Sequence, residues 1–308
     1  MDITIAHQKV WAALHSQAID RYHLAHTSSI RFVHYTSAEV AFKIIQYGKI
    51  WMRNAIATND YSEVQHGEAC LRFAWKSDAG KKMAALLNEL YPGMSNDVVR
   101  KHDSTFDIVR TNTYITCVSE HNTSEDITGR LSMWRAYGAT NGVALVINQT
   151  AMMSTVDDLK AYSSPVEYYS AQQAVAHISN VTEKIAQEKE AFRACGYDSV
   201  LNTVLQAFRF AVVSTKHPSF AEEQEWRIVY MPNIGSSPKI EKSFETVVGI
   251  PQIVYKLPIR DLSKVERIII GPTKYPKTIS DAFIDLLTEA GVTDPAARVV
   301  VSNLPLRQ

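Results

Sequence analysis

The spacing of apolar residues predicts a protein that mixes helices and strands. Residues 3–25 carry apolar side chains three or four positions apart, which is typical of an amphipathic helix. Residues 30–35 form a short β-rich run. Ser37 then provides an N-cap for a helix over 38–47, and Gly48 supplies its C-terminal stop. Residues 49–52 then form a second β-rich run, so the first unit is expected to be strand, helix, strand.

Two long helical segments separate the remaining predicted strands. Residues 62–110 have helical periodicity broken near Pro92, and residues 171–214 have it broken near Gly196. Short helices are expected at 131–137 and 278–290, and a polar loop at 120–129. Strands are expected at 49–52, 113–119, 142–148, 166–169, 225–231, 243–256, 267–271 and 298–302. We expect a single α/β (α+β) domain over 1–308, with a core of about 30–60, 111–170 and 218–303 and helical insertions at about 62–110 and 171–214.

Composition and charge narrow the class of protein. The 32 basic and 32 acidic residues cancel, so no overall field attracts nucleic acid or an anionic membrane. Three scattered cysteines, without metal-binding spacing, fit a reducing compartment. The sequence shows neither a signal peptide nor an apolar run long enough for a membrane span. These features predict a cytoplasmic protein that binds no membrane.

Two polar segments near the start are open to two interpretations. His34 closes a predicted strand, where its imidazole could meet a sugar hydroxyl or simply bond a backbone carbonyl in the core. Asn59 and Asp60, with Glu63 after them, could form a polar loop near His34. They could equally cap the helix that follows, because Asn and Asp accept from unpaired N–H groups at a helix start.

A third segment, residues 132–138, combines aromatic and cationic side chains. Trp134 is expected in the core, where it would pack the short helix on the sheet. Arg135 and Tyr137 are better candidates for ligand contact, because arginine seldom lies unpaired in a core. Such a pair can clamp a diphosphate and stack on a ring.

The segment 222–227 places charges in a predicted strand. At a period of two, Glu223, Glu225 and Arg227 share one face. Glutamate is depleted in strands, and this strand continues into an apolar run, so its carboxylates are expected to line a cleft. Solvated charge at a sheet edge is the alternative.

The order of these motifs resembles a large, little-characterised bacterial family. The matching pieces are H-Y-T, N-D-x-x-E, S-x-W-R-x-Y-G, E-E-x-E-W-R and I-I-G-P, which begin at residues 34, 59, 132, 222 and 269. They span about residues 31–275. The pattern also resembles ADP-ribosyltransferases of the class that takes His, Tyr and Glu from three strands. That resemblance implies a split β-sheet core and NAD as co-substrate, with no metal.

The resemblance also implies roles for particular residues. Glu225 would contact the nicotinamide ribose and promote transfer, and Glu223 would face the acceptor. Tyr137 would stack on the nicotinamide, with Tyr114 as its competitor. The remaining NAD contacts would come from the ribose-binding side chains and from the arginines that neutralise the pyrophosphate, namely His34, Tyr35, Thr36, Asn59, Arg130, Trp134 and Arg135.

Two hypotheses of function follow. The first is an NAD-dependent mono-ADP-ribosyltransferase, which resembles bacterial toxins of toxin–antitoxin systems and phage-defence effectors, with a protein or nucleic-acid acceptor. The second is a non-catalytic module that binds a nucleotide or a partner protein. The first requires His34, Tyr137 and Glu225 to converge on one cleft. Side chains on opposite faces of the sheet would not meet this requirement.

Overall fold

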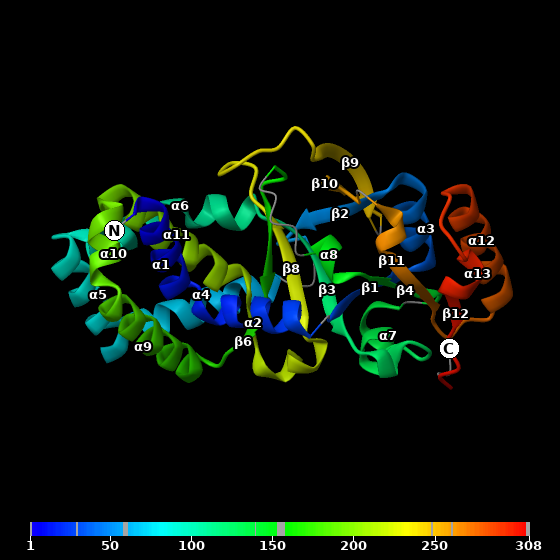
Figure 1. Cartoon of the computed structure of the whole chain (residues 1–308), viewed down its shortest axis with the longest axis horizontal. Coiled ribbons are helices and arrows are strands. Elements are labelled where there is room, and N and C mark those ends of the chain that lie inside the picture. The colour runs from blue at the N-terminus through cyan, green and yellow to red at the C-terminus, as the bar shows by residue number, and fades with distance from the viewer. Residues whose placement is uncertain are drawn as a thin grey trace. The chain divides into compact units, whose positions relative to one another are not determined.

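Contacts divide the chain into two compact units, and the computed structural model describes residues 2–28, 30–57, 61–138, 140–152, 158–247, 249–259 and 261–305. The helical unit comprises Met1–Leu24, Asn54–Thr113 and Ser164–Glu222. The sheet unit comprises Ala25–Arg53, Tyr114–Ser163 and Glu223–Gln308. The two long segments expected as helical insertions thus belong to one unit, together with the N-terminal helices (Figure 1).

The helical unit is built from amphipathic helices and one very small sheet. Its helices are α1 (Ile3–Leu14), most of α2 (Ser16–Thr27), α4 (Tyr61–Lys76), α5 (Asp78–Leu90), α6 (Met94–Thr111), α9 (Ala171–Gln187), α10 (Lys189–Cys195), α11 (Tyr197–Val213) and most of the 3₁₀ turn η2 (Pro218–Glu223). The two short strands β6 (Glu167–Tyr168) and β7 (Thr215–Lys216) pair in parallel. The predicted breaks near Pro92 and Gly196 are confirmed.

Local sequence explains how these helices meet. In α9, Ile178, Val181 and Ile185 recur at helical spacing and are buried. α4 approaches α11 so closely at Gly67 that an added Cβ would clash with the Val212 carbonyl oxygen. Glycine is therefore the residue that permits this helix contact.

Within the described residues, the sheet unit contains ten strands and the helices that cover them. Its strands are β1 (Arg31–Ser37), β2 (Lys49–Asn54), β3 (Tyr114–His121), β4 (Gly142–Ile147), β5 (Ala161–Pro165), β8 (Glu225–Tyr230), β9 (Glu241–Val247), β10 (Ile250–Pro258), β11 (Val265–Ile270) and β12 (Val299–Val301), of which β2 and β5 end within the helical unit. Its helices and 3₁₀ turns are α3 (Ala38–Tyr47), η1 (Thr123–Glu125), α7 (Leu131–Tyr137), α8 (Gln149–Met152), η3 (Leu262–Lys264), α12 (Pro276–Glu289) and α13 (Pro295–Arg298).

Several sequence signals are confirmed in this unit, and two boundaries differ. The Ser37 side chain accepts a hydrogen bond from the Val40 N–H, and Gly48 is left-handed with φ 59°. The expected strand over 243–256 is instead a hairpin of β9 and β10. The predicted loop over 120–129 begins later, because Glu120 and His121 extend β3 by pairing with β1.

The sheet forks at β3. β8 pairs with one edge of β3, from Tyr114↔Tyr230 to Ser119↔Glu225. β1 pairs with the opposite edge at Ser119–His121, and β2 also pairs with β3. One branch then continues as β4, β11 and β12, and the other as β10 and β9. The sheet is mixed, because β11 and β12 are parallel whereas β1 and β4, and β2 and β10, are antiparallel. The expected mixed α/β architecture is therefore confirmed.

Strand register assigns each side chain to a face of the sheet. Residues directly opposite each other share a face, and neighbours along a strand alternate. Val33 pairs with Ser119, and Ser119 pairs with Glu225, so these three share the face that we call the Trp134 face. His34, next to Val33, lies on the opposite face, which we call the His34 face.

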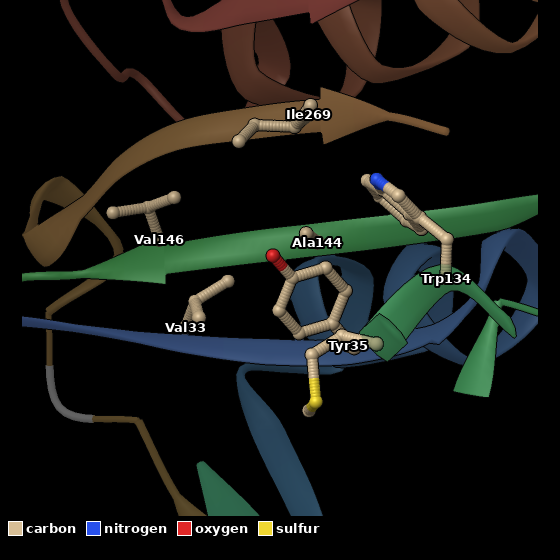
Figure 2. Packing of buried hydrophobic residues seen from close by; sticks show 7 residues of the cluster. Val33, Tyr35, Trp134, Ala144, Val146 and Ile269 are labelled. Carbon is tan, nitrogen blue, oxygen red and sulfur yellow. The ribbon is translucent and has the colours of Figure 1, made fainter. Parts of the chain in front are cut away.

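α7 packs on the Trp134 face through a buried cluster. Figure 2 shows Tyr35 and Trp134 meeting over β1 and β4, and the full cluster is Val33, Tyr35, Met133, Trp134, Ala144, Val146 and Ile269. The Trp134 indole donates to the Thr128 carbonyl at 2.8 Å. A Cβ added at Gly129 or at Gly271 would lie within 3 Å of the Trp134 ring. Both glycines therefore make room for the indole.

Candidate functional site

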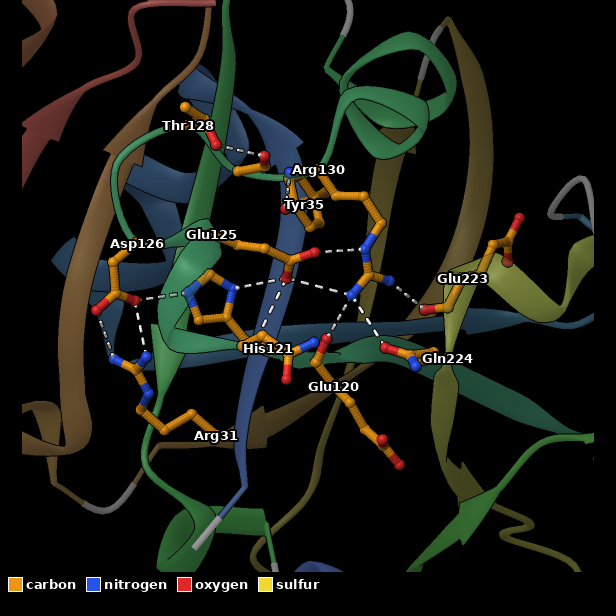
Figure 3. Close-up of polar contacts among 12 residues, drawn as sticks. Arg31, Tyr35, Glu120, His121, Glu125, Asp126, Thr128, Arg130, Glu223 and Gln224 are labelled. Carbon is orange, nitrogen blue, oxygen red and sulfur yellow. Dashed lines mark hydrogen bonds and ion pairs between the residues drawn. The ribbon is translucent and has the colours of Figure 1, made fainter. Parts of the chain in front are cut away.

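Arg130 links two nearby residues, Glu120 and Glu125, to a turn at Glu223 and Gln224 that is distant in the sequence. Its guanidinium donates to the Glu125 carboxylate (2.8 Å), to the Glu120 carbonyl (2.9 Å) and to the Glu223 carbonyl (3.2 Å). It also donates to the Gln224 side-chain oxygen at 3.1 Å. Figure 3 shows these bonds radiating from one side chain. Since Arg130 is only 9% exposed, it fixes the protein's own backbone and is not available to neutralise a pyrophosphate, contrary to the prediction.

Gln224 turns the chain sharply just before β8. Its φ is 46°, a left-handed conformation that costs free energy in a residue other than glycine. Its carbonyl accepts from the Glu120 N–H at 2.9 Å, which helps to hold the turn. Because the extended backbone starts only at Glu225, the expected shared face of Glu223 and Glu225 is wrong.

Glu223 meets Tyr137 at this turn. The Tyr137 hydroxyl lies 3.4 Å from Glu223 Oε1, at the long end of hydrogen-bonding distance. Tyr137 is 37% exposed, and Arg135 on the same short helix is exposed as well. We call the set Arg130, Tyr137, Glu223 and Gln224 the Glu223 corner. It joins an accessible aromatic ring and a carboxylate, both predicted as site residues, on a backbone that Arg130 fixes.

Tyr35 contacts the Glu223 corner through the backbone of Arg130, and Trp134 packs against Tyr35. The Tyr35 hydroxyl accepts from the Arg130 N–H at 2.8 Å, and burial raises its pKa to about 12. The Tyr35 ring meets the Trp134 indole edge-on, with centroids 4.9 Å apart. Both rings are buried, so the expected ligand contacts from them are not available, whereas the expected core position of Trp134 is confirmed.

His34 lies on the opposite face, where β1 separates from β3. Its Nδ1 is 2.8 Å from the Cys117 carbonyl oxygen and is therefore assigned as the donor. Burial lowers the pKa of this imidazole, which is accordingly neutral at pH 7. Thr36 shares its face. The interpretation of His34 as a histidine bonded to a backbone carbonyl matches these contacts.

Glu225 is buried and paired. It is 4% exposed, and its Oε1 accepts from Arg227 Nε at 2.7 Å, while Arg227 itself is fully buried. Glu225 projects from the Trp134 face and His34 from the other, so the two do not converge. Tyr114 shares the His34 face but is buried against Tyr255, with centroids 4.5 Å apart.

A second group of charged residues holds the loop that leads to Arg130. Asp126 accepts from Arg31 at 2.8 Å and lies 2.9 Å from His121 Nε2 (Figure 3). Burial opposes ionisation of Asp126, but the hydrogen bonds from Arg31 and His121 outweigh it and lower the pKa of the carboxyl. Sequence analysis missed this group because the segment 120–129 was interpreted only as a polar loop. The close spacing of Glu125, Asp126 and Arg130 was the available signal.

The remaining predicted features lie elsewhere or outside the description. Asn59 falls outside the described residues. Glu63 forms an ion pair with Lys216 at 2.9 Å inside the helical unit. Among the described residues, no cluster of three or more His, Cys, Asp and Glu side chains could hold a metal ion. In the same part of the chain, no helix is both long and apolar enough to span a membrane.

Comparison with known proteins gives one match. Residues 133–228 match a family model described as "Protein of unknown function (DUF2971)". The matched stretch contains Tyr137 and Glu223 and ends inside β8. No curated protein and no solved structure matches the chain.

Proposed function

We propose that the Glu223 corner binds a nucleotide of the NAD type without consuming it. The observation that carries this proposal is the contact between the exposed Tyr137 ring and the Glu223 carboxylate, 3.4 Å apart, on a backbone held by Arg130. A strained turn fixed by buried bonds is the kind of feature that proteins retain at functional sites.

The corner offers the interactions that a nucleotide needs. A carboxylate accepts hydrogen bonds from the two hydroxyls of a ribose, as Glu223 would. An exposed aromatic ring stacks on a base, and such stacking contributes about 1–3 kcal/mol. Arg135, which is exposed on the same helix, can pair with phosphate oxygens.

The arrangement supports binding better than turnover. Glycosyl transfer from NAD needs a carboxylate aimed at the developing positive charge in a site that excludes water. Glu225, which the resemblance assigns to that role, is paired with Arg227, and His34 faces the other side of the sheet. Glu223 is half-buried, and the 37% exposure of Tyr137 leaves solvent beside it.

A mono-ADP-ribosyltransferase is the second candidate. The fork at β3 favours it, because the resemblance implies a split sheet, and Glu223 beside Tyr137 supplies a carboxylate and an aromatic ring. Under this hypothesis Glu223 takes the catalytic role, and a protein or nucleic acid is the acceptor. A role as toxin or phage-defence effector, with an antitoxin as possible partner, belongs to this candidate alone.

Incubation of the purified protein with NAD separates the two candidates. We expect NAD to bind, as measured by isothermal titration calorimetry, while no nicotinamide is released, as measured by chromatography. Tyr137→Leu is expected to weaken binding at least fivefold through lost stacking, roughly 1 kcal/mol or more. His34→Ala is expected to bind as the unmodified protein does.

The contrary outcomes are distinct. Nicotinamide release that depends on Glu223 establishes the transferase. Release that depends on both His34 and Glu225 restores the three-strand arrangement that the register argues against. Absence of NAD binding rejects both candidates.

A further inference from the structure

The helical unit contains a cavity whose lining includes no residue of the Glu223 corner. Its volume is about 90 Å³. Its walls come from α1, α2, α4, α9, α11 and the β6–β7 pair, and they include apolar side chains such as Leu14, Leu71, Ile178 and Phe210. At about 15 Å³ for each, this is room for roughly six water molecules, or for one small ring.

Four polar side chains of the cavity wall have atoms that the protein leaves unbonded. These atoms are His15 Nε2, Glu167 Oε1, His177 Nδ1 and Ser214 Oγ, none of which has a hydrogen-bond partner among the described residues. Ser214 is only 4% exposed. Buried polar atoms are nearly always hydrogen-bonded, so four unbonded ones on a single cavity indicate that a ligand or water molecules bond them.

The local sequence places these groups together. The β6–β7 pairing brings Glu167 beside Ser214, through a backbone hydrogen bond of 2.8 Å from the Glu167 N–H to the Ser214 carbonyl. His177 packs against Tyr169, with ring centroids 5.4 Å apart. His15 lies against Phe210, with centroids 6.2 Å apart. The polar atoms thus come from helix α9, from strand β6, from the residue between α1 and α2 and from the residue that precedes β7.

The wall carries little net charge. Burial, and secondarily the nearby His177, lowers the pKa of His15 to about 4, and burial likewise lowers the pKa of His177. Both rings are therefore neutral at pH 7. Burial raises the pKa of Glu167, and the charge of Arg21 acts in the opposite sense. The two neutral histidines provide no positive charge that would attract an anion. The negative charge of Glu167, which would attract a cation, is balanced by the nearby Arg21.

We propose that this cavity binds a neutral nitrogen heterocycle of one ring. Apolar walls accept the flat faces of such a ring. Neutral histidines and a serine hydroxyl can each donate or accept, which suits a ring edge that alternates N–H groups and ring nitrogens. The volume admits one ring and excludes a nucleotide. This site is independent of the nucleotide proposed at the Glu223 corner.

Calorimetric titration at pH 7 with nicotinamide and with cytosine tests the proposal, with nicotinate as the charged analogue of the first. We expect at least one neutral ring to bind and nicotinate to bind at least tenfold more weakly. Ser214→Ala removes one hydrogen bond and is expected to weaken binding roughly three- to tenfold. Ser16→Ala is the matched control, because Ser16 Oγ is also buried and unbonded but Ser16 lies outside the described cavity wall.

A second variant fills the cavity. Ala174→Leu adds three carbons from α9 and is expected to abolish binding, with unchanged circular dichroism as the check on folding. If Ala174→Leu does not fold, the affinities of Ser214→Ala and Ser16→Ala for the neutral rings are compared instead. The proposal is overturned if neither neutral ring binds, if nicotinate binds equally well, if Ser214→Ala binds like Ser16→Ala, or if a crystal grown with these rings shows only water in the cavity.

Discussion

At the scale of single residues, Arg130 and Trp134 fix the positions of the Glu223 corner and of α7. His34 and Glu225, which first suggested a site, do not contribute to this corner. Arg130 uses its donors on Glu120, Glu125 and the Glu223–Gln224 turn, so one side chain sets the position of the corner. Trp134 sets the position of α7 by filling the space between Gly129 and Gly271. The contacts of Arg130 with the Glu223–Gln224 turn and of Trp134 with Gly271 are not visible from spacing along the chain, because they join segments that are distant in sequence.

Gly129→Ala tests the close fit around the indole. Gly129 has φ 65°, and a Cβ there would lie 2.7 Å from the Trp134 ring. We expect the free energy of unfolding to fall by about 2 kcal/mol, measured by urea denaturation. Gly235→Ala is the control, because a Cβ there meets only ordinary contacts at 3.7 Å and beyond. Equal stability of the two variants would contradict this role for Gly129.

At the scale of elements, the sequence predicted where helices and strands lie but not how strands face each other. Apolar spacing and caps located α3, α7 and the breaks near Pro92 and Gly196, because these signals are local. The faces of His34 and Glu225 depend on the register of β1, β3 and β8, which is set by tertiary pairing. The sequence therefore could not show whether His34 and Glu225 lie on the same face of the sheet, and only the strand register does so.

Acid should weaken the helical unit through its buried histidines. The pKa of His15 is about 4 in the folded chain and about 6.5 when unfolded, so the unfolded chain binds this proton first as pH falls. Stability from this source is complete above pH 6.5 and is lost progressively as pH falls to about 4. His177, whose pKa is also lowered, acts in the same direction.

Urea denaturation at pH 7 and pH 5 measures this effect. We expect a lower free energy of unfolding at pH 5 and a smaller difference between the two pH values in His15→Gln. His7→Gln serves as the control, because His7 is exposed on α1. A pH dependence that is the same in both variants would show that His15 does not contribute.

At the scale of the whole molecule, the chain forms two units with different candidate sites. The sequence predicted a single domain with two helical insertions, whereas contacts divide the chain into two units. Both predicted insertions fall in the helical unit, together with the N-terminal residues up to Leu24. Sequence analysis did not predict the cavity of the helical unit. Its polar atoms come from four separate segments, and no sequence motif indicates that these segments meet. The Glu223 corner was partly found, since Tyr137 and Glu223 each belonged to a recognisable motif.

The claim that Glu223 rather than Glu225 serves as the ligand carboxylate can be tested by one titration. NAD is titrated by calorimetry against the unmodified protein, Glu223→Gln and Glu222→Gln, where Glu222 is an exposed neighbour that undergoes the same change in charge. Loss of a hydrogen bond to a charged group costs about 1.5–3 kcal/mol, so Glu223→Gln should bind at least tenfold more weakly. Glu222→Gln should bind like the unmodified protein. Unchanged binding by Glu223→Gln would contradict the assignment.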